Sequence, residues 1–244
     1  GTPLGAWIGG TFGWRWTMGL MAVLSIVAAL WLHMRMPARV VPPPLSGSAW
    51  RQTLLSPTLM LTLSITVVSA AGQFIFFSYM APYVAERFGQ GAAALSSLLL
   101  VYGLCGFVGN AAVSRWIDRI GPARAMACAL GSIAVGMGLV GLTGSLSAMV
   151  LAIVPWGLGV FASNSSQQAR LVQLSPMLAP ASIALNTSAM YAGQAIGAGS
   201  GGWLIQAAGI TSLPTAGCIG LICALGLSLW AGRQARRHPV PGQP

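Results

Sequence analysis

The side chains that could do chemistry in this chain are few, and almost all of them are uncharged. Among 244 residues there are two acids, Glu86 and Asp118, no lysine, and two histidines, His33 and His238, near opposite ends of the sequence. A nucleophile or general base needs an imidazole or carboxylate within hydrogen-bond reach, and a metal ion needs several ligands close together. The sequence offers neither arrangement, so it predicts no enzyme, no cofactor and no metal site.

Amide and phenol side chains inside apolar stretches remain as candidates for binding a solute, because they exchange hydrogen bonds without carrying charge. Asn164 and Gln168 are four residues apart, on one face of a helix, where they could bind a neutral polar ligand together. The alternative is hydrogen bonding between helices, worth about 0.6 kcal/mol per bond in a membrane. The candidate cavity residues are Gln73, Tyr79, Asn164, Gln168, Asn186, Tyr191 and Gln194, with Asn110 and Gln167 as further polar positions.

Charge is concentrated in the stretch N-A-A-V-S-R-W-I-D-R-I-G-P-A-R, residues 110–124, which contains Asp118, Arg119 and Arg124 and is broken by Gly121 and the proline after it. Apolar segments precede and follow it. An Asp or Arg at the centre of a membrane helix costs about 2.5–3.5 kcal/mol on insertion scales. We therefore expect a short loop in water at the surface of a bilayer.

Composition indicates the class of protein. The chain is 55% hydrophobic and 6% charged, whereas soluble domains carry about 25% charged residues. Its net charge of +10 would suggest nucleic-acid binding in a soluble protein, but here the arginines lie between apolar stretches, where they orient a membrane protein. The sequence predicts an all-α polytopic membrane protein in contact with lipid, with no nucleic acid as partner. Four cysteines without a CxxC motif are expected to be buried free thiols: Cys105, Cys128, Cys218 and Cys223.

Apolar segments of about 20 residues indicate one partial and seven full membrane helices. The stretch at 37–56, with V-V-P-P-P-L-S-G-S, is expected to be a non-helical linker because proline fixes φ and lacks a donor. It separates the end of an N-terminal bundle at 1–36 from a C-terminal six-helix bundle at 57–232, which is followed by a basic tail at 233–244. The expected helices are 1–12, 16–34, 57–82, 94–114, 124–142, 147–168, 181–207 and 213–230.

Arginines are distributed unequally between the two ends of these helices. Ten fall in one set of alternate connections, Arg170 among them, and two, Arg15 and Arg87, fall in the other. Cytoplasmic loops are enriched in Lys and Arg. We therefore expect a multi-pass protein of the cell (inner) membrane whose linker, Asp118 loop and C-terminal tail are cytoplasmic.

Small residues recur at intervals of four in two places. One set surrounds Pro3, at Gly1, Gly5 and Gly9, and the other is Gly193, Gly197 and Gly201. Each set lies on one face of its helix and lets another backbone approach closely. The pattern predicts helix packing, and two interpretations stay open: plain bundle assembly, or faces that rock as a transporter changes state.

Four stretches resemble one family. G-T-P-L-G-A-W-I-G-G-T-F-G-W-R-W at 1–16 resembles the Gly-Pro motif in the fifth helix of drug and sugar efflux permeases of the major facilitator superfamily. F-F-S-Y-M-A-P-Y-V at 76–84 resembles the end of the seventh helix in its arabinose-efflux type. S-R-W-I-D-R-I-G-P-A-R at 114–124 resembles the loop between the eighth and ninth helices, and A-L-N-T-S-A-M-Y-A-G-Q-A-I-G-A-G-S-G-G at 184–202 is similar to the eleventh.

The resemblance implies helices five to twelve of a twelve-helix protein, truncated at its N-terminus, in which two bundles rock about a central site. It implies efflux driven by protons, and Asp118 paired with arginine as a latch when the cytoplasmic side is shut. Where the subgroup often has a small amide, this chain has Tyr191, which implies a bulkier cavity wall. We expect a monomer that exports a small neutral or amphipathic solute such as a sugar, nucleoside or drug. The alternative is a non-transporting scaffold or sensor, or a non-functional transporter fragment.

Overall fold

The computed structural model describes residues 5, 8, 9, 11–35 and 46–237, and every regular element within them is a helix. Helices satisfy their own backbone hydrogen bonds, which a chain in lipid must do. By length and composition, six helical stretches of the described residues are able to cross a membrane. The predicted all-α membrane fold is confirmed.

The elements are α2 (Trp14–Arg35), α3 (Gly47–Leu55), α4 (Pro57–Phe77), α5 (Met80–Phe88), α6 (Ala92–Ile120), α7 (Pro122–Leu142), α8 (Leu146–Leu174), α9 (Ala179–Ala208) and α10 (Leu213–Arg237).

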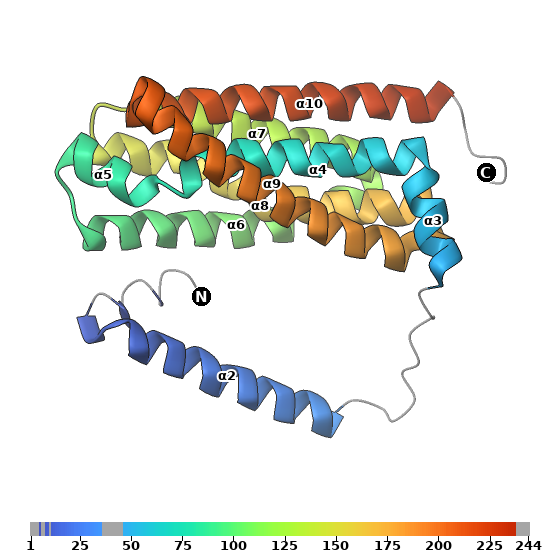
Figure 1. Ribbon diagram of the computed structural model, residues 1–244, viewed down its shortest axis with the longest axis horizontal. Helices are drawn as coiled ribbons and strands as arrows, with labels where there is room; N and C mark the ends of the chain where they lie inside the picture. The colour runs from blue at the N-terminus through green and yellow to red at the C-terminus, as the bar shows by residue number, and fades with distance from the viewer. Residues whose placement is uncertain (1–4, 6–7, 10, 36–45, 238–244) are drawn as a thin grey trace.

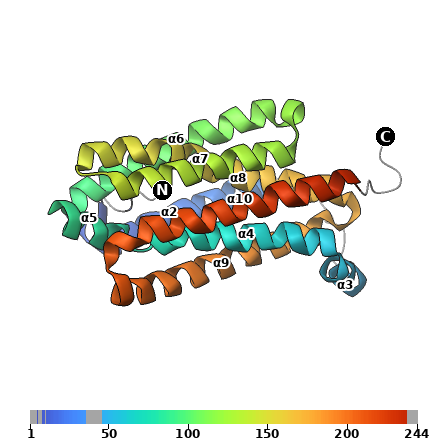
Figure 2. The same cartoon turned by 90° about the horizontal axis from the view of Figure 1, so that it is seen from above.

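The long helices α4, α6, α7, α8, α9 and α10 form one bundle. Helix α2 lies apart from this bundle and has no buried side chain (Figure 1). Contacts follow the order α9, α4, α10, α7, α8 and α6 across the bundle (Figure 2). Side chains of α4 and α8 also meet across its middle. The ends of α4, α6, α7, α8, α9 and α10 alternate between the two ends of the bundle, as expected for successive crossings.

Polar caps set where several helices begin. Ser56 precedes Pro57, and its hydroxyl accepts a hydrogen bond from the Leu59 amide at 3.4 Å. Such a cap satisfies an otherwise free N–H, and proline is tolerated in the first turn because it needs no donor there. Between α6 and α7 the chain turns at Gly121, whose φ of 83° suits glycine.

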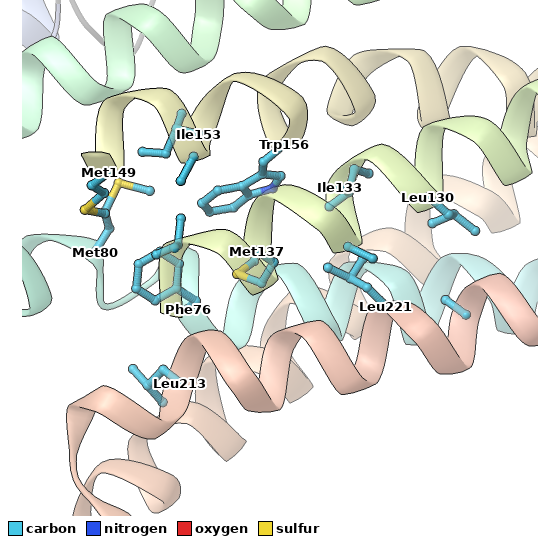
Figure 3. Packing of buried hydrophobic residues seen from close by; sticks show 14 of the residues in the cluster. Phe76, Met80, Leu130, Ile133, Met137, Met149, Ile153, Trp156, Leu213 and Leu221 are labelled. Carbon is cyan, nitrogen blue, oxygen red and sulfur yellow. The ribbon is translucent and has the colours of Figure 1, made fainter. Parts of the chain in front are cut away.

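The interior is filled by large apolar side chains around Trp156, which is fully buried (Figure 3). Phe76 packs against it with ring centroids 5.8 Å apart. Ile133 and Met137 approach from α7 and Leu221 from α10. Burial of this cluster joins α4, α7, α8 and α10 into one unit.

Close helix contacts depend on glycine. A Cβ at Gly197 would lie 2.4 Å from the Ala71 carbonyl oxygen, and a Cβ at Gly193 would lie 2.4 Å from the Val67 carbonyl oxygen. The stripe at Gly193, Gly197 and Gly201 therefore faces α4 directly. Of the other set, only Gly5 and Gly9 are within the described residues, near the Thr17 side chain, whereas Pro3 lies outside them.

Several boundaries differ from those expected. The stretch at 57–82 is two helices, because Pro82 cannot donate to the Ser78 carbonyl and its ring crowds that group. The linker at 37–56 was predicted to be non-helical throughout, but α3 forms within it, capped by Ser46, whose hydroxyl accepts from the Ala49 amide at 3.2 Å. The expected helix at 1–12 and the tail beyond 237 fall largely outside the described residues.

Two further expectations need correction. All four cysteines are free thiols, but Cys128 and Cys223 are exposed and Cys105 and Cys218 are only half-buried, so the prediction that they are buried is wrong. Arg170 does not lie in a connection, since it is part of α8 and only 4% exposed. The expected span at 181–207 exists as α9, but its many Gly, Ser and amide residues make it less apolar than the six stretches that are able to cross a membrane.

Candidate functional site

An aromatic and amide cluster lies where α4, α6 and α8 meet. The Trp156 indole donates to the Gln73 side-chain oxygen at 3.4 Å. Phe77 and Tyr102 complete the cluster, with Tyr102 5.0 Å and Phe77 6.0 Å from Trp156 between ring centroids. Gln73, Phe77 and Tyr102 are partly exposed, whereas the indole is buried. The cluster thus presents an amide and two aromatic rings beside a rigid core.

Asn164 and Gln168 lie on the flank of α8 between its contacts with α4 and α6. Trp156 and Gln167 point from α8 to α4, and the backbone at Leu158 contacts Gly109 of α6. With 3.6 residues per turn, Asn164 and Gln168 project between these two directions. Asn164 is exposed, Gln168 is half-buried, and the Gln168 amide donates to the Asn164 oxygen at 3.4 Å.

On α9, Tyr191 and Gln194 flank the glycine stripe. Tyr191 is 61% exposed, Gln194 is half-buried, and neither forms a hydrogen bond with a residue that the structure describes. We use the name open face for the set of exposed and half-buried side chains at Gln73, Phe77, Tyr102, Asn164, Gln168, Tyr191 and Gln194 on α4, α6, α8 and α9, of which the two on α9 are grouped with the rest because α9 packs against α4. All of them are uncharged.

Asn186 does not reach the open face, because it is 2% exposed and bonded to α4. The Thr66 hydroxyl donates to its side-chain oxygen at 2.6 Å, and the Gln167 amide donates to the Thr66 hydroxyl at 2.9 Å and to the Thr62 carbonyl at 2.6 Å. This geometry is that of hydrogen bonds between helices, the alternative considered for each polar residue. Thr66 was not among the candidates from sequence, since a single Thr in an apolar run carries no distinctive pattern.

Tyr79 lies at the break between α4 and α5. Its hydroxyl donates to the Ala198 carbonyl of α9 at 2.8 Å, and its ring lies against Gly201 and Gly202. Small residues on α9 leave room for this ring. The side chain therefore joins the helix break to α9 and is not free to bind a solute in this conformation.

The charged segment is helical up to its turn. Asp118 and Arg119 are in the last turn of α6, which ends at Ile120, and Arg124 is in the first turn of α7. All three side chains are exposed, and Asp118 forms no ion pair with any described residue. The loop that was expected between these two helices therefore consists of Gly121 alone. The exposed carboxylate of Asp118 is accessible to a binding partner.

These features define a multi-pass helical membrane protein with an uncharged open face and a charged segment around Asp118 at one end. The family model for the Major Facilitator Superfamily matches residues 1–177 and 62–244, so the chain belongs to that superfamily. It is 24% identical over 94% of its length to the "Uncharacterized MFS-type transporter YbcL" of Bacillus subtilis. It is 25% identical over 90% of its length to the "Probable sugar efflux transporter" of Mannheimia succiniciproducens, and 27% identical over 91% to the "Purine ribonucleoside efflux pump NepI" of Salmonella enteritidis. The chain spans 59%, 55% and 56%, respectively, of the length of these relatives.

Proposed function

We propose that the protein is a secondary transporter that exports a small neutral or amphipathic solute, such as a sugar, nucleoside or drug, by alternating access. The open face carries this proposal. It presents amides and aromatic rings without charge, in a bundle whose helices expose apolar side chains such as Phe107, Leu151 and Trp203. Amides bind hydroxyl and carbonyl groups, and rings cover the apolar parts of a solute. Relatives named for sugar and purine ribonucleoside efflux are in keeping with this class.

Alternating access needs two bundles that rock about a site between them. The six described helices α4 and α6–α10 supply one, and we propose that the working transporter contains a second one facing the open face. A proton gradient is the proposed energy source. Because no acid lies on the open face, the coupling group would belong to the second bundle. We also propose a monomer with a cytoplasmic C-terminus in the inner membrane.

Asp118, Arg119 and Arg124 are proposed as a gate at the cytoplasmic end. Exposed ion pairs contribute only about 0–1 kcal/mol, so such a contact forms and breaks easily. The carboxylate of Asp118 is exposed and forms no ion pair with a described residue, so it is the group available for a partner on the second bundle. Gly121 keeps the segment short and lets the two helices meet at a sharp turn.

The test is transport in membrane vesicles that contain the full-length protein, with an imposed proton gradient and a panel of sugars, nucleosides and cationic dyes. We expect gradient-dependent movement of one class. Asp118→Ala is expected to abolish movement while the protein remains inserted, and Glu86→Ala, at the other end of the bundle, serves as the control that retains it. Transport restricted to a strongly anionic compound would contradict the proposal.

A further inference from the structure

Arg170 of α8 is a buried cation. Its side chain is 4% exposed, and its Nη1 donates to the Ser228 hydroxyl of α10 at 3.1 Å. A guanidinium has several further N–H donors. None of these has a partner among the residues that the structure describes.

No carboxylate within the described part of the chain neutralises that charge. The two acids, Glu86 and Asp118, are both exposed, and neither forms an ion pair with a described residue. Arginine keeps its proton in proteins, so it cannot become neutral as a buried lysine would. Leaving its charge buried and unpaired is strongly destabilising. An opposite charge must therefore come from elsewhere.

A second buried donor lies one helical turn away. Ser166 precedes Arg170 by four residues, on the same side of α8, and its side chain is fully buried. Its hydroxyl has no hydrogen-bond partner among the residues that the structure describes. The neighbouring Gln167 oxygen also lacks a partner within the described part of the chain, but it is an acceptor and would attract a water or another donor instead of an anion.

We propose that Arg170, Ser166 and Ser228 form a buried site for a small inorganic anion of the chloride type, held between α8 and α10. The site offers one positive charge and two hydroxyl donors, the groups that a halide requires. Water would satisfy the free N–H groups but leave the charge unneutralised. The side chains of Arg170, Ser166 and Ser228 are all buried within this bundle, so a small diffusible ion fits the site better than a carboxylate carried by another bundle.

The site is separate from the proposed transport function. Ser166 and Arg170 point away from the flank of α8 that carries Asn164 and Gln168, given 3.6 residues per turn. The bound anion would link α8 to α10 inside one bundle. Its loss is therefore expected to loosen that bundle without removing a group from the open face.

The experiment measures the Tm of the purified full-length protein in sodium chloride and in sodium gluconate at equal ionic strength. We expect a saturable rise of about 5 °C in chloride once the ion is well above its Kd, and a similar rise in bromide. Arg170→Met should abolish the difference between the salts. Arg87→Met, an exposed arginine at the other end, should preserve it.

If Arg170→Met does not fold, the same two Tm values are measured for Arg170→Lys. This variant keeps the positive charge, so its Tm should still be higher in chloride than in gluconate, by a smaller difference than in the unmodified protein. Equal Tm values in the two salts would overturn the proposal and indicate a protein carboxylate as the counter-charge. A chloride effect that survives in Arg170→Met would also overturn it. Neither readout involves transport, so the proposed function can fail independently.

Discussion

The contact between α9 and α4 allows a sharp test at Gly197. An alanine there would place its Cβ 2.4 Å from the Ala71 carbonyl oxygen and 3.0 Å from the Ala71 Cα. Backbone atoms cannot rotate away as a flexible side chain would, so the two helices must separate. Overpacking of this kind costs about 1–3 kcal/mol.

Gly199 is the matched control on the same helix, because a Cβ there meets nothing within 4 Å. Replacing glycine by alanine within a helix gains about 1 kcal/mol from helix propensity. That gain is common to both variants and cancels in their comparison. The remaining difference in the free energy of unfolding is the cost of the clash, about 1–3 kcal/mol in favour of Gly199→Ala.

The assay is thermal unfolding of the full-length protein in detergent, followed by tryptophan fluorescence. For a protein of this size each kcal/mol shifts Tm by about 2–4 °C, so Gly197→Ala should unfold about 2–12 °C below Gly199→Ala. Equal Tm values, or a higher Tm for Gly197→Ala, would refute the reasoning that α9 and α4 are held at backbone contact by this glycine.

Three further predictions concern the polar network, the turn and the gate. Thr66→Val removes the hydroxyl that bonds both α8 and α9, and should destabilise the protein by about 1–2 kcal/mol in thermal unfolding, whereas Thr187→Val, exposed on α9, should change little. Gly121→Ala forces an L residue to a φ of 83° and should cost about 1–2 kcal/mol by the same measurement, while Gly131→Ala, in open space within α7, should be neutral or stabilising. Asp118→Asn should leave stability within about 0.5 kcal/mol, because the carboxylate is exposed and unpaired among the described residues, yet should lower transport in vesicles.

Composition and the length of the apolar segments were sufficient to predict a helical membrane protein and most of its helices. Six of the expected segments correspond to single helices of the structure, because a span of about 20 apolar residues has few alternatives in lipid. The break at Tyr79 follows from Pro82 acting on the carbonyl four residues before it. The sequence pattern contained that proline, but continuous hydrophobicity favoured one long span.

The polar positions were harder to assign, because one sequence cannot show which flank of a helix faces a neighbour. Asn186 and Asn164 look alike in sequence, yet Asn186 is bonded inside the bundle and Asn164 is exposed. Arg170 was assigned to a connection by its charge. Only the packing of α8 against its neighbours shows that this arginine is buried.

The central claim is that the open face binds the exported solute. The most direct measurement is the KM for export of the solute identified in vesicles, compared between Gln168→Leu and Ser97→Ala, the second of which alters an exposed hydroxyl on α6. The account predicts that Gln168→Leu raises KM about tenfold or more, at unchanged Tm, because a lost hydrogen bond leaves a polar group of the solute unpaired. Identical KM values for the two variants and the unmodified protein would contradict it.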